Sequence, residues 1–187
     1  MTSDDDPTLK IEDFRDYLIV LARTRIGSPY QAHLDASDIV QETLLEAHRK
    51  SDQFRGTEAA SMAAWLRQML AFNLTDRIRA LHRQKRDTSR EIAIDAISLE
   101  ESSLRLQELV ASQQSSPSLQ MRRLETLLEI ASALEQLPET QREAVRMRYI
   151  EGLPLSEISQ QLDRTTTAVA GLLKRGLENL RGQFDPT

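Results

Sequence analysis

A cluster of basic side chains gives this sequence its clearest potential for chemistry. Residues 67–90 hold seven bases and two acids, a net charge of +5, although the whole chain carries −5. Residues 1–16 and 91–119 each carry −4, so the basic segment lies between two acidic ones. Binding to phosphates needs local positive potential rather than a basic protein. The pattern therefore favours a nucleic-acid backbone as the partner of residues 67–90, with a merely solvated basic face as the alternative.

Three polar side chains near residue 40 are spaced for a contact with another protein. Asp38, Gln41 and Glu42 stand at i, i+3 and i+4, which places them on one face of a helix. The apolar residues between them turn toward a core. An acidic and polar face on a rigid helix suits a basic partner helix, because complementary charge gives orientation as well as attraction. A solvated face without a partner is the alternative.

Residues 155–177 have the spacing of a helix-turn-helix. Ile158 and Leu162 face inward from a short helix, Asp163 and Arg164 make the turn, and Thr165 or its neighbour can cap the next helix. In this motif the second helix places its polar face in the major groove of DNA. The expected DNA-facing residues are Arg164, Thr165, Thr166, Thr167, Ala170, Gly171, Lys174 and Arg175. An ordinary helical hairpin is the alternative.

The elements that must position these residues are all helical. Apolar residues recur at helical spacing almost everywhere, which predicts an all-α fold. We expect a first helix that closes near Gly27 and Pro29, a second from Ser37 or Asp38, and further helices over 59–85, 119–137, 138–150, 155–162 and 165–180. Residues 87–118 have the acidic and polar composition of a linker, although its leucines permit a helix. The sequence thus predicts two small helical domains, 1–86 and 119–187, joined by a linker over 87–118 that few contacts cross.

Composition excludes several classes of function. The 187 residues are 40% hydrophobic and 28% charged, a composition typical of globular proteins. The sequence contains no cysteine, which excludes disulfides and thiolate metal sites. The lack of cysteine also favours the reducing cytoplasm as the location of the protein. The three histidines are not paired at ligand spacing, so we expect no metal and no cofactor. No phosphate loop or nucleophile–base pair is present, so we expect that the protein is not an enzyme. The sequence contains no apolar stretch of about 18 residues, so we expect no membrane span. We also expect no signal peptide.

The segment around the helix-turn-helix is similar to region four of bacterial sigma factors. The similarity rests on Leu137-Pro138, Arg142, Val145, Glu151-Gly152 and Glu157-Ile158, at the offsets that this family shows. The resemblance implies a domain that reads the minus-thirty-five promoter element and docks on the polymerase flap.

A second stretch, Asp38-Ile39-Val40-Gln41-Glu42-Thr43, resembles sigma region two. In the family this helix grips the coiled coil of the largest polymerase subunits, which implies that Asp38, Gln41 and Glu42 bind core RNA polymerase. Phe54-Arg55-Gly56 and the residues after it resemble the segment that recognises and melts the minus-ten element, a task that needs apolar platforms beside cations. The implied residues are Trp65, Asn73, Asp76, Arg77, Arg79, His82, Arg83, Lys85 and Arg86. For Trp65 a core position is the alternative.

The chain also departs from the family pattern. Asp163 stands in the turn where relatives often have glycine, and Ala170 and Gly171 replace longer polar side chains. Asn73 precedes Asp76 by three residues rather than four. We therefore expect the minus-thirty-five contact to depend more on DNA backbone and shape than on base edges. The larger sigma factors' region three is missing, which resembles the extracytoplasmic-function (ECF) group.

The resulting hypothesis is a sigma factor that binds core RNA polymerase and promoter DNA and directs transcription initiation at a restricted set of genes. An anti-sigma factor is a further partner that the resemblance implies. Two alternatives stay open, a polymerase-independent helix-turn-helix regulator and a helical protein-interaction module. The regulator does not explain Asp38–Thr43 and the separate basic segment, whereas the weak recognition face would allow the interaction module.

Overall fold

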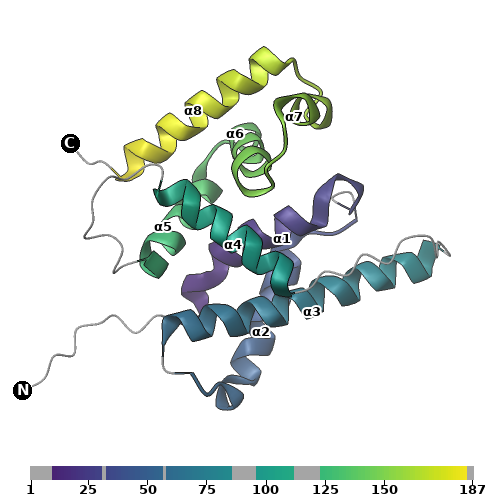
Figure 1. Cartoon of the computed structure of the whole chain (residues 1–187). Helices are drawn as coiled ribbons and strands as arrows, with labels where there is room; N and C mark the ends of the chain where they lie inside the picture. The colour runs from purple at the N-terminus through teal and green to yellow at the C-terminus, as the bar shows by residue number, and fades with distance from the viewer. Residues whose placement is uncertain (1–9, 31–32, 57, 86–95, 112–122, 185–187) are drawn as a thin grey trace, which may run out of the picture.

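The computed structural model describes residues 10–30, 33–56, 58–85, 96–111 and 123–184. Within these ranges every regular element is a helix, which confirms the all-α prediction (Figure 1). None of these helices is long and apolar enough to cross a membrane. We call the helices up to residue 85 the N-terminal unit and those from residue 123 the C-terminal unit.

The N-terminal unit is a small helical bundle. It contains a 3-10 turn η1 (Ile11–Phe14), then α1 (Arg15–Tyr30), α2 (Ala36–Arg49), a 3-10 turn η2 (Ser51–Gln53) and the long α3 (Ala59–Lys85). Helix α2 begins where Asp35 accepts a hydrogen bond of 2.7 Å from the backbone N–H of Ser37, a side-chain N-cap. Figure 1 shows the C-terminal end of α3 projecting beyond the rest of the molecule. The described part of the basic segment, up to Lys85, therefore lies on a helix that extends beyond the bundle.

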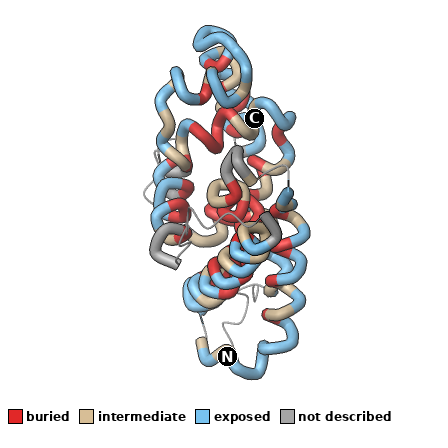
Figure 2. Tube along the Cα trace, turned by 90° about the vertical axis from the view of Figure 1, so that its right-hand side faces the viewer, coloured by how far each residue is buried: buried red, intermediate tan, exposed pale blue. Residues whose placement is uncertain are grey.

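Helix α1 is buried on every side. Six consecutive residues, Tyr17 to Ala22, are no more than 2% exposed. Such a helix must have neighbours all around it, and α1 contacts α2 and α3 of its own unit as well as α4 and α5. Figure 2 shows these buried segments gathered at the centre of the molecule. Helix α1 therefore belongs to the core of the whole chain rather than of one unit.

A helix, α4 (Ala96–Ala111), lies within the expected linker. Three of its leucines, Leu99, Leu106 and Leu109, are buried, and α4 packs on α1 and α3 as well as on α5. Figure 1 shows α4 between the helices of the two units. The acidic and polar composition of residues 87–118 had suggested a chain with few contacts, and for α4 that expectation is wrong, because the leucine spacing forms an apolar stripe.

The C-terminal unit contains α5 (Arg123–Gln136), α6 (Glu139–Val145), a π-helical turn η4 (Arg146–Ile150), α7 (Leu155–Gln161) and α8 (Thr166–Phe184). Pro138 is the N-cap of α6, where its missing N–H costs no helical hydrogen bond. Gly152 has a positive φ of 76° and ends the π-helical turn. These breaks set α6, α7 and α8 against one another around a core that includes Val145, Ile158 and Val169.

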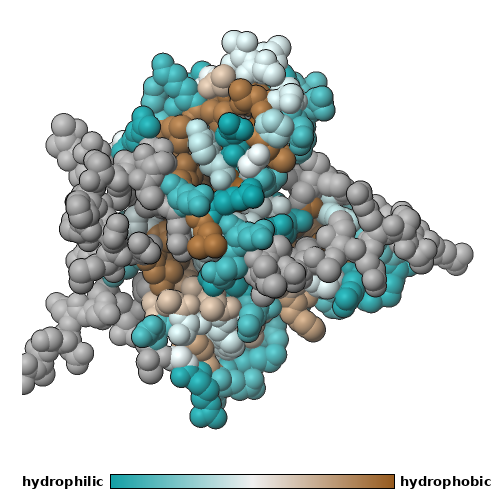
Figure 3. Space-filling model, in the orientation of Figure 1, coloured by the Kyte–Doolittle hydropathy of each residue, from teal (hydrophilic) through white to brown (hydrophobic). Residues whose placement is uncertain are grey.

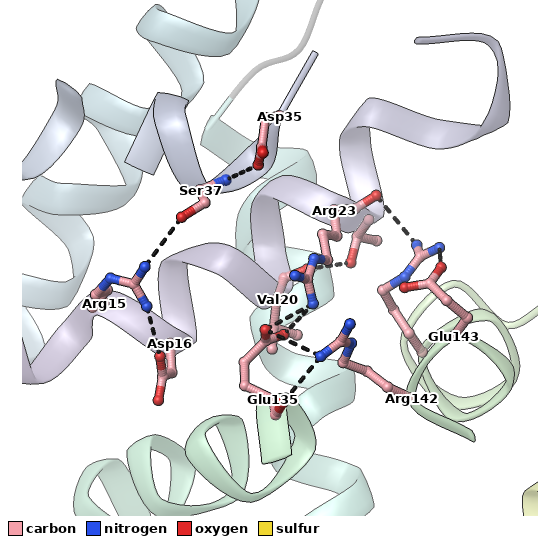
Figure 4. Close-up of polar contacts among 11 residues, drawn as sticks. Arg15, Asp16, Val20, Arg23, Asp35, Ser37, Glu135, Arg142 and Glu143 are labelled. Atoms are coloured by element: carbon pink, nitrogen blue, oxygen red, sulfur yellow. Dashed lines mark hydrogen bonds and ion pairs between the residues drawn. The ribbon is translucent and has the colours of Figure 1, made fainter. Parts of the chain in front are cut away.

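Ion pairs and hydrogen bonds join the two units directly (Figure 4). Arg23 on α1 pairs with Glu135 on α5 at 2.7 Å, and both side chains are mostly buried. Arg146, only 2% exposed, donates from Nη1 to the backbone oxygen of Arg23 at 3.2 Å. The expectation of few contacts between the domains is therefore wrong in this structure, because α1 presents an apolar side and Arg23 to the C-terminal unit.

Candidate functional site

The outer face of α2 is a shallow groove lined with charged residues. Asp38, Gln41 and Glu42 are all exposed and line it together, as the spacing predicted. Leu45 lies in the same groove and is 51% exposed, an unusual position for a large apolar side chain. Leu45 was not among the residues expected from the sequence, although it continues the same helical face, four residues after Gln41 and three after Glu42. Three acids, Asp38, Glu42 and Glu46, and two bases, Arg49 and Lys50, line the groove around Leu45. A mixed-charge rim around an apolar centre is suited to a partner helix with an apolar ridge and charged flanks, and the end at Asp38 and Glu42 is suited to basic side chains.

One residue of this face is joined to the basic helix. The guanidinium of Arg77 on α3 donates to the Glu42 carboxylate from Nη2 at 2.7 Å and from Nε at 3.2 Å. The hydrogen bond to Glu42 and its negative charge raise the pKa of Arg77 above its ordinary value, so Arg77 stays charged. Arg77 thus lies toward α2 rather than with the other basic residues of α3. The structure brings the expected polymerase-binding and DNA-binding residues into direct contact here.

Asn73 lies inside the N-terminal unit. Only 9% of its surface is exposed, and its side-chain amide donates to Thr43 Oγ1 at 3.0 Å and to Glu46 Oε2 at 3.1 Å. Hydrogen bonds from Lys50 and Asn73 lower the pKa of Glu46, which keeps its carboxylate as the acceptor. Asn73 therefore fastens α3 to α2. This geometry disagrees with the expected contact to a minus-ten base, because the amide is already bonded and mostly covered.

Two aromatic residues at the start of α3 pack on each other. The rings of Phe54 and Trp65 have centroids 5.2 Å apart, and both residues are half-buried. Gly56 lies beneath them, since a Cβ there would come within 2.6 Å of the Phe54 ring. The dense packing favours the core alternative for most of the Trp65 ring. A third aromatic residue, Phe72, is 69% exposed and was not among the expected site residues.

The solvent face of α3 beyond Phe72 is mostly polar and basic. Phe72, Asp76, Arg79 and Arg83 follow one another at helical spacing, and all four are exposed. His82 turns the other way, since its Nε2 lies 3.1 Å from the Tyr30 hydroxyl and the two rings meet edge-on. The Lys85 side chain and Arg86 lie outside the described residues. The described face combines one exposed aromatic ring with two cations, the combination that unpaired bases need.

The helix-turn-helix is formed by α7 and α8 as the spacing predicted. Asp163 makes the turn with a φ of 49°, a left-handed conformation that asparagine and aspartate adopt more readily than other side chains. Thr165 then accepts a hydrogen bond of 3.1 Å from the backbone N–H of Ala168, which caps α8. Val169 and Leu173 are buried against the unit's core.

The expected DNA face of α8 is exposed and sparsely charged. Exposed positions are Arg164, Thr165, Thr166, Thr167, Ala170, Lys174 and Arg175, whereas Gly171 is half-buried. A Cβ at Gly171 would lie 3.4 Å from Nη1 of Arg175, so the arginine lies along the helix over the glycine. Lys174 is 3.9 Å from Glu178, one turn further on. Figure 3 shows the end of the molecule where α7 meets α8 as a pale surface of weak polarity.

Two segments of the chain match known protein families, and relatives match along most of its length. Residues 11–84 match the model of "Sigma-70 region 2", and residues 127–180 match that of "Sigma-70, region 4". The ECF RNA polymerase sigma-E factors of Escherichia coli K12 and Salmonella typhimurium LT2 are each 27% identical over 161 residues, which cover 85% of this chain and 78% of theirs. The ECF RNA polymerase sigma factor SigK of Mycobacterium ulcerans is 25% identical over 150 residues, 80% of this chain and 72% of that protein.

The chain belongs to the sigma-70 family, in its ECF group. In this sigma factor, region two contains η1 to α3 and region four contains most of α5 together with α6, α7 and α8. Helix α4 lies between the two matched segments. Within the described residues no group of three or more histidine, aspartate or glutamate side chains is placed to hold a metal ion.

Proposed function

We propose that this sigma factor binds core RNA polymerase through α2 and promoter DNA through α3 and α8, and so directs transcription initiation at a restricted set of genes. One observation carries the proposal. A single chain exposes a groove with the acids Asp38 and Glu42 on α2, a basic face with an aromatic ring on α3, and a helix-turn-helix of α7 and α8. A DNA-binding regulator that acts without polymerase needs only the last of these. In this proposal residues 1–86 form the region-two domain and residues 119–187 form the region-four domain.

The polymerase contact is assigned to Asp38, Gln41 and Glu42, with Leu45 as its apolar centre. An exposed leucine surrounded by polar residues has the layout of a binding hot spot, in which the apolar residue is desolvated and the rim excludes water. Complementary charge on the partner sets its orientation. A basic helix of the polymerase is therefore the expected partner. An anti-sigma factor that covered this groove would inhibit the protein.

The minus-ten contact is assigned to the exposed side of α3. Phe72 supplies a stacking platform, and Arg79 and Arg83 supply cations for the phosphates of one strand. Lys85 and Arg86 extend the basic run in sequence and keep their place in the proposal. We leave Asn73 out because its amide is engaged inside the bundle. His82 and Trp65 act as supports, since each is packed against another aromatic ring.

The minus-thirty-five contact is assigned to the N-terminal half of α8. Short side chains there let the helix approach the DNA backbone closely, and Arg164, Lys174 and Arg175 provide charge for phosphates. Base edges are usually read by bidentate arginine, lysine, asparagine or glutamine. Because this face offers few of them, we expect weak discrimination between bases. A scan of every upstream base against promoter activity tests this expectation, and two positions with strong single-base preference would contradict it.

Reconstitution with core polymerase tests the proposed function. The full chain is mixed with core enzyme and fragmented genomic DNA, and the starts of the transcripts are mapped. We expect copurification with core enzyme and starts at a small set of promoters that core enzyme alone does not use. DNA binding without polymerase binding would favour the polymerase-independent regulator, and binding of neither would favour the interaction module. As a transcription factor without a reaction of its own, the protein would act in the cytoplasm with the polymerase.

A further inference from the structure

The groove on α2 carries charges of both signs, and their order along the helix is regular. Asp38, Glu42, Leu45 and Arg49 line the groove and follow one another at intervals of four, three and four residues, so they form one stripe along the helix. Acids stand at the N-terminal end of this stripe, the apolar side chain near its centre and the base at its C-terminal end. Asp38 and Arg49 are about 17 Å apart along the helix axis. The stripe therefore has a direction.

Hydrogen bonds and ion pairs within region two use the middle of the groove rather than its ends. The two acids nearest the centre, Glu42 and Glu46, accept hydrogen bonds from side chains of α3. In the described part of the chain, no hydrogen bond or ion pair includes Asp38 or Arg49, and both residues are exposed. Leu45 lies between them and is 51% exposed. The two ends of the stripe and its apolar centre are therefore available to a partner.

The end of the helix itself explains only part of the role of Arg49. A cation in the last turn of a helix interacts favourably with the helix dipole, and Arg49 lies in the last turn of α2. His48 lies in the same turn, contacts Glu12 and is outside the groove. Lys50 follows and pairs with Glu46. Arg49 is thus the cation of this helix end that both lines the groove and lacks a partner of its own.

We propose that α2 fixes the direction of its partner helix as well as attracting it, with Arg49 as a further docking residue. This inference rests on the proposed function, in which core RNA polymerase binds at α2. The occupant is a polymerase helix with a basic side chain opposite Asp38, an apolar ridge opposite Leu45 and an acidic side chain opposite Arg49. The two charges of that helix are about 11 residues, or three turns, apart.

Opposite charges at the two ends discriminate between directions, which a purely acidic stripe does not do. A uniformly basic helix is attracted to an acidic stripe equally in both directions. Here, a helix laid in the wrong direction would place its base against Arg49 and its acid against Asp38, and both contacts are repulsive. Direction matters because Glu42 also joins the groove to Arg77 on α3. The direction of the partner on α2 therefore sets where the DNA-facing side of α3 lies on the polymerase.

Titration of labelled sigma factor with core enzyme, without promoter DNA, tests the proposal. The variants are Asp38→Arg and Arg49→Glu, with Arg55→Glu as the matched control, because Arg55 is an exposed arginine of region two outside the groove. Both groove variants are expected to weaken binding about tenfold or more, and the control to bind like the natural protein. A partner attracted by negative charge alone would bind Arg49→Glu more tightly. Unchanged or tighter binding of Arg49→Glu would therefore overturn the proposal.

A conservative series separates docking from a role in the helix end. Arg49→Lys keeps the charge and is expected to bind core enzyme within about twofold of the natural protein, whereas Arg49→Gln should lie between Arg49→Lys and Arg49→Glu. Thermal unfolding and helical content by circular dichroism are measured for each variant. An Arg49→Glu protein with a lower unfolding temperature and unchanged binding would assign Arg49 to the helix end alone. Equal loss of binding in Arg49→Lys and Arg49→Glu would also contradict the proposal, because charge would then not be the cause.

An exchange of the two charges tests direction itself. The double variant Asp38→Arg with Arg49→Asp keeps the net charge of the groove and reverses the stripe. We expect it to bind core enzyme no better than the weaker of Asp38→Arg and Arg49→Glu, and binding at the natural level would refute a fixed direction. A natural protein that does not bind core enzyme would overturn the proposed function and this inference together. Natural binding that is lost in Asp38→Arg but kept in every Arg49 variant would overturn only the inference.

Discussion

The ion pair between Glu42 and Arg77 allows a sharp test of polymerase docking. In the free protein Glu42 is 49% exposed and Arg77 is 52% exposed, so the pair is at the surface. Exposed pairs contribute about 0.2–1 kcal/mol to folding stability. Glu42→Gln should therefore lower the free energy of unfolding by no more than about 1 kcal/mol, and Arg77→Gln by a similar amount. Stability alone does not distinguish a docking residue from a structural one.

Binding to polymerase does distinguish the two roles. If Glu42 contacts a basic helix of the polymerase, its removal leaves that cation desolvated and unpaired, which typically costs 2–5 kcal/mol. Even the lower figure weakens binding about 30-fold. Arg77→Gln removes a competitor for the same carboxylate, so it should leave polymerase binding unchanged or make it tighter. The two halves of one ion pair are therefore expected to have opposite effects.

The assay is a fluorescence anisotropy titration of labelled sigma factor with core enzyme, beside thermal unfolding of the same variants. Glu58→Gln is the matched control, since Glu58 is an exposed acid of region two outside the groove. Equal losses of binding in Glu42→Gln and Arg77→Gln would refute the reasoning, because the pair would then act only by holding α2 against α3. Wild-type binding in Glu42→Gln would remove Glu42 from the docking surface.

The remaining predictions concern three other places in the chain. Asp163→Ala should destabilise the protein by about 1 kcal/mol in denaturant unfolding while Asp163→Gly should not, because the turn needs a positive φ. Phe72→Ala should reduce open-complex formation, read with a fluorescent base at the minus-ten element, and Phe72→Trp should restore it; equal activity of both would exclude stacking. Arg79→Ala with Arg83→Ala should lower the salt slope of promoter binding by about 1.8 for two lost phosphate contacts on duplex, and an unchanged slope would mean a merely solvated face. Burial raises the pKa of Glu135 despite the charges of Arg23 and Arg142, so the folded chain favours its protonated form. The contribution of Glu135 to the free energy of unfolding should therefore be full below the ordinary carboxyl pKa and fall as the pH rises through the raised pKa; Glu135→Gln should remove it, which denaturant unfolding of both proteins across pH checks.

Much of the fold followed from the sequence because helices are local. The spacing of apolar residues located α2, α3 and the helix-turn-helix, and turn chemistry placed the break at Asp163. The same local reasoning predicted that Asp38, Gln41 and Glu42, the proposed docking residues, share one exposed side of α2, as they do.

Other features depended on partners far along the chain. Asn73 was expected to face DNA, but its amide bonds to Thr43 and Glu46, about 30 residues earlier, and helical spacing within α3 does not reveal that. Arg77 likewise turns toward Glu42 on another helix. One signal for the packing of α1 against α5 was present in the sequence. The six consecutive apolar residues from Tyr17 to Ala22 leave this part of α1 no solvent face. A helix of a small free-standing bundle would carry polar residues on one side.

The DNA face of α8, with few long polar side chains, bears on how this sigma factor would select its promoters. A recognition helix with alanine and glycine at its centre, and with Arg175 lying along the helix, has few groups to read bases. Region four alone would then bind DNA with little selectivity. Selectivity can arise instead from simultaneous engagement of both promoter elements, because a tethered second contact is strengthened only where the spacing is correct.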